Sequence, residues 1–334
     1  MNKTQFATEW TVGTVAGTGQ QGYSGDGSSA LDGRLNNPFD LAFSPDGSLI
    51  FSDTFNHCIR RIDFATDTIS TIAGTGARGF AGDGGPATQA LLNEPYGVVI
   101  DTAGSVYFAD RLNGRVRVVR PNGTISSIAG DGSGASSGDG GPAASAGMAE
   151  PNGLALSPDG NRLFIADVAG HRVRVIDLRT GVIGTFAGTG EGRHDGDGGP
   201  PEKAAIFGAR AVAFAPDGTL YVMERQGSCI RRIRDGVIEM EAGTGGHGYA
   251  GDGGPARDAV FDRPKEMAVG PDGSIFVVDT ENHAIRRIDG KSGTIATIDG
   301  ALARPHGAVV AADGSLYVGD SEHHQIRRLT PQAA

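Results

Sequence analysis

Six residues of different chemistry occupy one position of a segment that the chain otherwise repeats. Each copy begins with proline or alanine, and the apolar residues that follow are alike from copy to copy. The variable residue is the second of each copy: Phe39, Tyr96, Asn152, Arg210, Lys265 and His306. Repeats stay alike where their packing is the same, so a position that differs in every copy is the first candidate for a functional site.

Cations dominate the chemistry at this position and around it. Arg210 and Lys265 come from consecutive repeats, and Arg111 and Arg225 each follow the acid that ends a second apolar strand. The formal net charge of the whole chain is −10. Four cations that converge in an acidic protein predict a bound small anion, such as a carboxylate or a phosphate.

Two members of the set could transfer a proton. We expect His306 and Tyr96 to act as acid or base in catalysis, with Glu266 or Glu150 as a carboxylate partner. The arginines would then hold the anion or stabilise developing negative charge.

Three further residues are predicted to contact the substrate. Asn152 and Phe39 share the variable position, and His194 stands in a loop where most other repeats have an aromatic residue. The alternative is structural: the rings plug the space, the cations pair with neighbouring carboxylates, and the histidine is a solvated loop residue.

Each repeat holds four strands, which the second copy shows clearly. Apolar or alternating runs at 97–100, 106–110, 115–119 and 124–129 are separated by turns or short loops. In other copies the first turn reads Ser-Pro-Asp-Gly, in which proline sets the first turn angle and glycine tolerates positive φ.

An offset between the two ends of the chain predicts that the repeats close into a ring. A strand of the fourth type, residues 10–17, precedes every first-type strand, whereas the last repeat ends at Leu329 without one. An N-terminal strand that pairs with the C-terminal repeat explains both facts. We therefore predict an all-β fold, a six-bladed β-propeller with four antiparallel strands per blade, blade repeats over 38–329 and one domain over 1–334.

Antiparallel order predicts which face carries the site. Loops between the second and third strands, and loops between blades, share one face, and these are the long ones. Functional residues concentrate on loops that a rigid scaffold positions, so we expect the site on this face, at the mouth of the central channel.

The motifs resemble NHL repeats. The resemblance rests on the P-x-G-[VLM]-A starts, the N-H-x-I-R-R-I strands at 56–62 and 282–288, and the G-D-G-G-P-A loops, and it covers residues 10–329. It implies the propeller fold. It leaves function open, because NHL propellers include enzymes, RNA-binding modules and protein-interaction modules.

Related propeller enzymes raise the question of a metal in the channel. Peptidyl-α-hydroxyglycine amidating lyases bind zinc through histidines of P-H-[GSD] starts, which His306 matches, and use an arginine at the place of Arg111. The gluconolactonase group binds a divalent cation partly through an asparagine that Asn152 matches. The other ligand positions of both groups lack metal-binding residues here. We expect no metal; if zinc or calcium is bound, Asn152, His306 and Glu150 are its expected ligands.

Two residue types recur in nearly every repeat and are interpreted as scaffold. An aspartate in each long loop is predicted to make an Asx turn or to cap a short helix rather than to bind Ca²⁺. An arginine in each third strand is predicted to pair with the acid that ends the second strand. The loop aspartates are Asp26, Asp83, Asp139, Asp197 and Asp252, and the arginines are Arg60, Arg117, Arg174, Arg231, Arg286 and Arg327.

Composition narrows the partners and the compartment. The net negative charge argues against nucleic acid and against an anionic membrane surface as partners. Cys58 and Cys229 occupy equivalent positions on opposite sides of the ring, so we expect no disulfide. Residues 1–9 are polar and no apolar run approaches ~20 residues, so we expect no signal peptide and no membrane span. These features favour a reduced, cytoplasmic, monomeric protein.

Two functions remain in competition. The first is an enzyme of the lyase or hydrolase type that acts on a small carboxylate- or phosphate-bearing metabolite in the channel. The second is a non-catalytic propeller that binds a protein or a ligand. RNA binding is disfavoured by the net charge.

Overall fold

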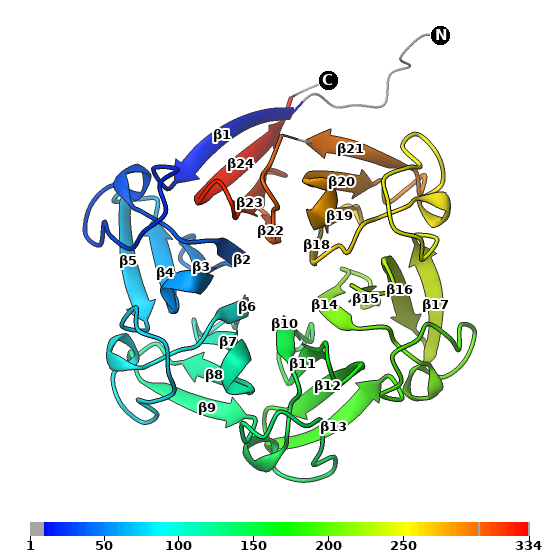
Figure 1. The fold of residues 1–334 in the computed structure, drawn as a ribbon, viewed down its shortest axis with the longest axis horizontal. Helices are drawn as coiled ribbons and strands as arrows, with labels where there is room; N and C mark the ends of the chain where they lie inside the picture. Colours follow the sequence, from blue (N-terminus) through cyan, green and yellow to red (C-terminus); the bar gives the residue numbers. More distant parts are fainter. Residues whose placement is uncertain (1–9, 300, 333–334) are drawn as a thin grey trace.

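The repeats fold into six four-stranded antiparallel sheets that stand as blades around a central axis (Figure 1). The computed structural model describes residues 10–299 and 301–332. Blade 1 comprises β2 (Pro38–Phe43), β3 (Leu49–Asp53), β4 (Cys58–Asp63) and β5 (Thr68–Ala73). Blade 2 comprises β6 (Pro95–Ile100), β7 (Val106–Asp110), β8 (Arg115–Val119) and β9 (Ile125–Ala129). Blade 3 comprises β10 (Pro151–Leu156), β11 (Arg162–Asp167), β12 (Arg172–Asp177) and β13 (Val182–Ala187). Blades 4 and 5 comprise β14 (Ala209–Phe214), β15 (Leu220–Glu224), β16 (Cys229–Arg234) and β17 (Val237–Ala242); and β18 (Glu266–Val269), β19 (Ile275–Asp279), β20 (Ala284–Ile288) and β21 (Ile295–Asp299).

Blade 6 draws its strands from both ends of the chain. It consists of β22 (Gly307–Val310), β23 (Leu316–Asp320), β24 (Gln325–Pro331) and the N-terminal strand β1 (Trp10–Ala16). Strand β1 runs antiparallel to β24 as the outermost strand of this blade, with Val12 opposite Leu329 (Figure 1).

The predicted starts of the innermost strands are confirmed in four blades and shifted in two. Each copy of the repeated segment was predicted to open its strand, but β18 and β22 begin at Glu266 and Gly307, two residues after the prolines that start their copies, Pro264 and Pro305. The residues just before them still bond the second strand, because the Lys265 N–H donates to the Val278 carbonyl and the His306 N–H to the Gly319 carbonyl. These residues therefore remain fixed although they lie outside the regular ladder.

Apolar side chains pack between neighbouring sheets rather than in one central core. Where blade 6 meets blade 1, for example, Leu41, Phe51 and Ile326 belong to one buried cluster. A fully buried side chain of this size contributes roughly 1.5–3 kcal/mol to folding, and truncation of Phe51 to alanine would cost about 3–5 kcal/mol. This packing holds each blade against the next and fixes the ring that carries the channel residues.

Short 3-10 turns interrupt the long loops. In four inter-blade loops the turn follows a proline in extended conformation, as at Pro86, which stands before the turn rather than at its first position. Gly82, at φ 97°, allows the close approach, since a Cβ there would lie 2.7 Å from the Ala90 Cα. The turns are η1 (Ala30–Asp32), η2 (Thr54–Asn56), η3 (Ala87–Gln89), η4 (Arg111–Asn113), η5 (Ala143–Ser145), η6 (Pro201–Lys203), η7 (Ala256–Asp258) and η8 (Thr280–Asn282).

Five of the six repeated arginines are buried where the third strands meet the loops, and the sixth, Arg327, has a side chain that is 23% exposed. In blade 2, Arg117 is fully buried and donates to Asp83 Oδ1 at 2.8 Å, to Asp110 Oδ2 at 3.4 Å, and to the carbonyls of Leu91 and Ala81 at 3.0 Å. The predicted pairing of the arginine with the strand-end acid is confirmed here. We call this kind of site an arginine pocket.

The interpretation of the loop aspartates as Asx-turn or helix-capping residues is wrong. The side chains of Asp26, Asp83, Asp139, Asp197 and Asp252 each accept from the buried arginine of the same repeat. A buried guanidinium needs carboxylate partners, and this need outweighs the local turn preference of aspartate.

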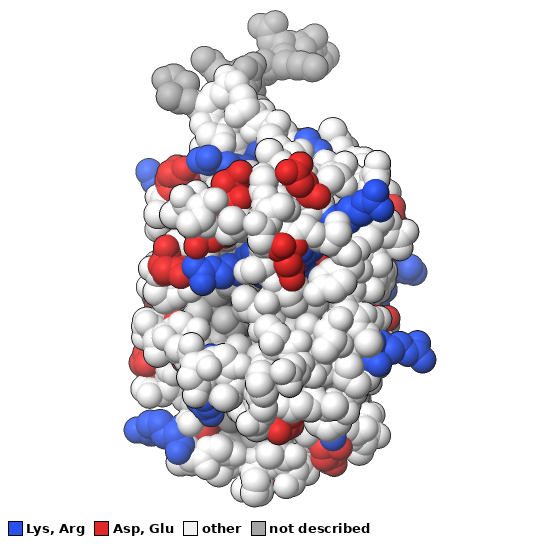
Figure 2. All heavy atoms as spheres, turned by 90° about the vertical axis from the view of Figure 1, so that its left-hand side faces the viewer, with Lys and Arg blue, Asp and Glu red and all other residues white. Residues whose placement is uncertain are grey.

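Figure 2 shows both signs of charge interspersed over the side of the molecule where β5 and β9 lie.

Cys58 and Cys229 are buried and not bonded to each other. In the described part of the chain, no helix has the length and hydropathy that crossing a membrane requires. Residues 1–9, for which a polar N-terminus without a signal peptide was predicted, lie outside the described residues.

Candidate functional site

Five of the six variable residues touch one another at the long-loop end of the innermost strands. The Phe39 ring stacks on the His306 ring at 3.8 Å and meets the Tyr96 ring edge-on at 4.7 Å. The Arg210 guanidinium lies over the Tyr96 ring at 4.9 Å. The Lys265 Nζ is 3.0 Å from His306 Nε2. We call Phe39, Tyr96, Asn152, Arg210, Lys265 and His306 the rim.

The sixth member, Asn152, supports a loop. Its side chain is 1% exposed, and its Nδ2 donates to the Glu150 carbonyl at 2.9 Å. This contact ties the start of β10 to the loop that precedes it.

Arg111 sits at the rim with two carboxylates of its own. Its guanidinium donates to Glu150 Oε1 at 2.8 Å and to Glu94 Oε2 at 2.7 Å, and it lies over the Tyr96 ring at 4.9 Å. One of the four predicted cations is therefore neutralised inside the protein. Glu150 is engaged by this pair, so it is not the partner of His306.

The partner of His306 is a lysine, and the expected carboxylate lies elsewhere. His306 Nδ1 lies 2.8 Å from the Arg304 carbonyl, which can only accept, so Nδ1 carries the hydrogen. The Nε2 lone pair is then free to accept from the Lys265 ammonium. Glu266, predicted to assist His306, instead accepts from the Met267 backbone N–H and is influenced by the charge of Asp40.

Burial and positive neighbours shift the proton affinities of this pair. Burial, with the charges of Lys265 and Arg210, lowers the pKa of His306 well below its usual value. Burial and Arg210 also lower the pKa of Lys265 to about 7, although Glu281 Oε1 lies 3.3 Å from its Nζ. Near neutral pH, His306 is therefore neutral and Lys265 can gain or lose a proton.

Two arginines at the rim lack acceptors for their charged groups. Arg210 is 6% exposed, and its guanidinium has no hydrogen-bond or ion-pair partner within residues 10–299 and 301–332. Arg225 Nε is buried and likewise without a hydrogen-bond partner among the described residues. The charge of Arg225 acts on both Arg210 and Lys265. Arg210 therefore makes no direct ion pair within the described residues, although its charge acts on the buried acids Asp40 and Glu266.

A pair of buried acids lies one residue further along two of the innermost strands. Asp40 accepts from the backbone N–H groups of Val98 and Leu41, both at 2.8 Å, and Glu266 accepts from that of Met267 at 3.0 Å. Burial raises the pKa of Asp40 to about 6. Burial and the charge of Asp40 raise the pKa of Glu266 well above its usual value. Glu266 therefore gives up its proton less readily than an exposed carboxyl, and burial disfavours two charges on this pair.

The sequence contained a signal for this acid pair. The residue after the variable position is small in four repeats and acidic in the other two. These residues are Asp40, Gly97, Gly153, Ala211, Glu266 and Gly307. Two acids among glycine and alanine mark a second asymmetric position, which the predicted site did not include.

The residues named as conditional metal ligands are not brought together. Asn152 bonds the Glu150 backbone, the Glu150 carboxylate bonds Arg111, and His306 Nε2 faces Lys265. Each of these groups already has a partner that a cation would have to displace.

His194 lies apart from the rim, in the arginine pocket of blade 4. Its Nδ1 is 3.2 Å from Glu224 Oε2, and its Nε2 is 3.3 Å from Asp197 Oδ2. The hydrogen bond with Glu224 raises the pKa of His194. The sequence placed this histidine on the correct face but could not show that its loop folds back between blades.

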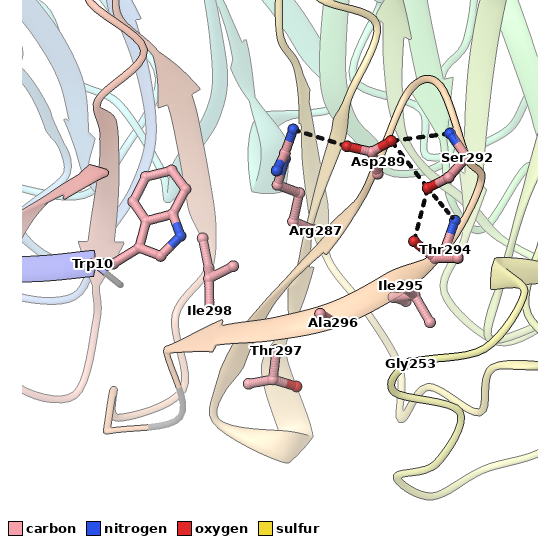
Figure 3. A pocket seen from close by; sticks show the side chains of 10 residues that line it. All are labelled: Trp10, Gly253, Arg287, Asp289, Ser292, Thr294, Ile295, Ala296, Thr297 and Ile298. Atoms are coloured by element: carbon pink, nitrogen blue, oxygen red, sulfur yellow. Dashed lines mark hydrogen bonds and ion pairs between the residues drawn. The ribbon is translucent and has the colours of Figure 1, made fainter. Parts of the chain in front are cut away.

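A cavity of about 280 Å³ lies away from the channel, between the outer strand β21 and Trp10 of β1 (Figure 3). Its polar lining is an ion pair between Arg287 and Asp289, with Ser292 bonded to the same carboxylate. Because these polar groups already bond one another, the cavity has fewer free charged groups for a ligand than the rim has.

Comparisons with known proteins agree with the repeat architecture. The NHL repeat family matches residues 261–288 and 302–329, and the teneurin NHL domain family matches residues 72–137. Protein SUPPRESSOR OF QUENCHING 1 of Arabidopsis thaliana, a chloroplastic protein, is 29% identical over 311 residues. This alignment covers 85% of the present chain and 28% of the Arabidopsis protein, so the chain spans little more than a quarter of that relative.

Solved structures share the fold at low sequence identity. An auxiliary nutrient binding protein from Bacteroides thetaiotaomicron superposes with a TM-score of 0.69 at 16% identity, over 96% of this chain and 76% of the other. Virginiamycin B lyase from Staphylococcus aureus superposes with a TM-score of 0.55 at 17% identity, over 96% and 86%. The same architecture thus serves a binding protein and an enzyme, and the likeness extends to the fold alone.

Proposed function

We propose that this chain, an NHL-repeat six-bladed β-propeller, binds a small organic anion at its rim and acts on it as an enzyme of the lyase or hydrolase type. The observation that carries the proposal is Arg210. A guanidinium that is 6% exposed and has no acceptor among the described residues is costly unless a ligand supplies one.

The charges around Arg210 support an anionic ligand. Arg111 has Glu94 and Glu150 as partners, and Lys265 shares Glu281 with Arg304. Arg210 and Arg225 make no direct ion pair within the described ranges, although the charge of Glu266 acts on Arg210. A carboxylate or phosphate between these two arginines would receive charge-assisted hydrogen bonds in a site sheltered from water, where such bonds are strongest.

Lys265 and His306 supply the proton transfer. With a pKa of about 7, the neutral amine of Lys265 is available at physiological pH and can accept a proton from the substrate. His306 orients this amine through Nε2, and the Arg304 carbonyl fixes the tautomer of His306 through Nδ1. Removal of a proton next to a carboxylate would begin a lyase reaction, and activation of a water would begin a hydrolysis. Lys265, which the sequence assigned to substrate binding, therefore becomes the proposed base.

One observation favours a second candidate, a binding propeller without catalysis. Phe39, Lys265 and His306 are 4%, 6% and 7% exposed, and two of them are stacked rings. A rim this closed admits a small anion more readily than a large substrate. In that case Arg210 and Lys265 would hold the ligand and no bond would change.

The test begins with binding of simple anions. A panel of small carboxylates, phosphate monoesters and inorganic phosphate is screened by ligand-observed NMR, and hits are measured by calorimetry. We expect at least one hit whose affinity falls tenfold or more in Arg210→Gln and is unchanged in Arg179→Gln, a matched arginine whose side chain is 73% exposed. If no member of the panel binds, or if Arg210→Gln binds equally well, the anion site is wrong.

Catalysis is tested separately on the hits. Product formation is followed by NMR for the wild type and for Lys265→Met. Turnover that is lost in Lys265→Met supports the enzyme. Binding without turnover in the wild type favours the non-catalytic propeller.

A further inference from the structure

The arginine pocket of blade 4 differs from the others in its side chains. In blades 1, 2 and 5 an aromatic ring from the preceding loop lies beside the buried arginine, at 5.4, 5.2 and 5.0 Å from its guanidinium carbon. In blade 4 this ring is replaced by His194, and the aspartate that ends the second strand elsewhere is replaced by Glu224, which is one methylene longer. The third strand of the blade begins with Cys229. Two substitutions in one repeat thus set a histidine and a longer carboxylate side chain beside a cysteine.

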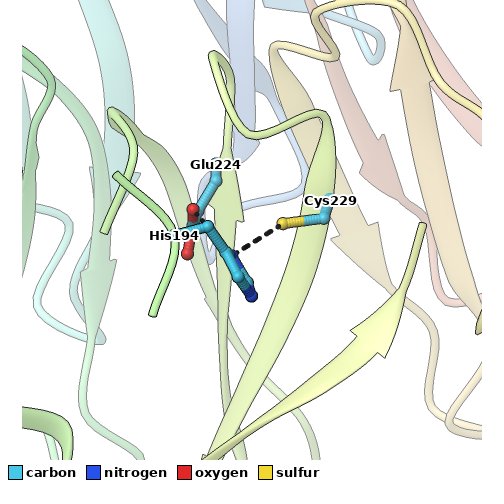
Figure 4. Close-up of side chains that lie close together, drawn as sticks. All are labelled: His194, Glu224 and Cys229. Atoms are coloured by element: carbon cyan, nitrogen blue, oxygen red, sulfur yellow. Dashed lines mark hydrogen bonds and ion pairs between the residues drawn. The ribbon is translucent and has the colours of Figure 1, made fainter. Parts of the chain in front are cut away.

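These three side chains point their donor atoms at one another (Figure 4). His194 Nδ1 is 3.2 Å from Glu224 Oε2 and 3.6 Å from Cys229 Sγ, and all three atoms lie within 4.8 Å of one another. Zinc bonds of about 2.0–2.3 Å at tetrahedral angles separate neighbouring N, O and S ligands by roughly 3.3–3.6 Å. The distances to His194 therefore match the edges of a zinc coordination tetrahedron.

The surroundings resemble those that orient metal ligands. Asp197 Oδ2 lies 3.3 Å from His194 Nε2, and Asp197 Oδ1 is in turn 2.9 Å from the Nε of Arg231. A metal-bound histidine typically donates its other ring N–H to such a carboxylate, which fixes the ring and leaves the first nitrogen for the ion. Glu224 is held as well, since Arg231 donates to its Oε1 at 3.2 Å and the Phe207 N–H to its Oε2 at 2.9 Å.

Partial exposure on one side of the site would let an ion enter, and burial on the other sides would hold it. The side chains of His194 and Glu224 are 29% and 0% exposed, and Cys229 is fully buried. An ion can approach past the histidine, and water can complete its coordination from that side. The positive charge of Arg231 is matched by Asp197 and Glu224 together, which leaves negative charge for a cation.

We propose that His194, Glu224 and Cys229 bind a zinc ion, with Asp197 orienting the histidine. The ion binds the Nδ1 lone pair of the neutral His194 ring, whose one hydrogen lies on Nε2 toward Asp197. It also takes the place of the thiol hydrogen of Cys229, and that proton passes to solvent. This site is separate from the rim and does not depend on the function proposed there.

Blade 1 provides a matched control within the same chain. Cys58 begins β4 as Cys229 begins β16, and it is equally buried, but its loop carries Tyr23 and its strand-end acid is Asp53. A general affinity of buried cysteines for metal would therefore appear at both sites, whereas the proposed site exists only in blade 4.

The experiment uses the purified full chain with Zn²⁺ and Co²⁺ as probes. We expect one equivalent of zinc by elemental analysis. We also expect Co²⁺ to give a thiolate charge-transfer band in the near ultraviolet and visible bands of tetrahedral intensity. Both should be lost in Cys229→Ser and His194→Tyr and kept in Cys58→Ser. Tyrosine stands at the position of His194 in two other repeats, so His194→Tyr should keep the fold, which its far-ultraviolet circular dichroism checks.

Asp197→Asn is expected to bind zinc about 10–100-fold more weakly, as loss of an orienting carboxylate predicts. A wild-type chain that takes up no zinc or cobalt overturns the proposal. So does a thiolate band that survives in Cys229→Ser or disappears in Cys58→Ser.

Discussion

The arginine pockets and the rim are built from the same repeats, but a buried arginine has carboxylate partners in the pockets and no direct carboxylate partner at the rim. Arg117 is fully buried and has two carboxylates and two carbonyls as partners. Arg210 is 6% exposed and has no acceptor among the described residues. The first arginine recurs in every repeat, and the second occurs once. A compensated charge that recurs is scaffold, whereas an uncompensated charge that occurs once points to a ligand.

The largest effect is expected from breaking a pocket. Arg117→Met should lower the free energy of unfolding by about 3–5 kcal/mol, because Asp110 is left buried without its cationic partner. Urea unfolding measures this loss, and Arg179→Met, which removes an exposed arginine, should change stability by less than about 0.5 kcal/mol. Equal effects of the two substitutions would show that the pockets do not hold the blades together.

Replacing Glu266, whose charged form burial disfavours, should change how the stability of the protein depends on pH. Because the pKa of Glu266 is raised in the folded state, wild-type stability is lost as pH rises from the unfolded pKa toward the folded one. Glu266→Gln cannot ionise in either state. Its stability should therefore resemble the wild type near pH 4 and exceed it by more than about 1 kcal/mol at pH 7. Denaturant unfolding at several pH values checks this, and a constant difference across pH would contradict it.

The sharpest contrast with Arg117 comes from the same substitution at the rim. Arg210→Met removes a buried charge that makes no direct ion pair among the described residues, so we expect stability to be unchanged or raised by about 1 kcal/mol, while affinity for a bound anion falls tenfold or more. Thermal unfolding and calorimetry measure the two effects. A destabilisation as large as that of Arg117→Met would mean that Arg210 is a structural tie.

The smallest effect concerns pH. Lys265 is charged below its pKa of about 7, and a bound anion would raise this pKa by favouring the charged form. Affinity for the anion should therefore be greatest below pH 7 and fall a few-fold per unit as pH rises through about 7. Lys265→Met should bind more weakly at pH 6 and show no such decline. An identical pH profile in wild type and variant would remove Lys265 from the site.

Most of the fold could be predicted because strand periodicity and turn residues can be recognised within short segments of the sequence. Apolar strand patterns and recurring Pro-Asp-Gly turns mark the strands, and six copies of one pattern make the ring the simplest arrangement. The site was predicted as a position rather than as a set of contacts. The sequence marked His306 and Lys265 as unusual, but nothing along the chain shows that their nitrogens lie 3.0 Å apart.

The amino-acid sequence by itself determined the number of blades, the face that carries the long loops and the six unlike residues of the rim. These follow from spacing and from comparison of one repeat with the next. Tertiary structure alone decided which charges are compensated, because Arg111 finds two carboxylates from neighbouring loops and Arg210 finds none. Charge pairing and burial depend on distances between residues of different blades, and such distances exist only once the ring is closed.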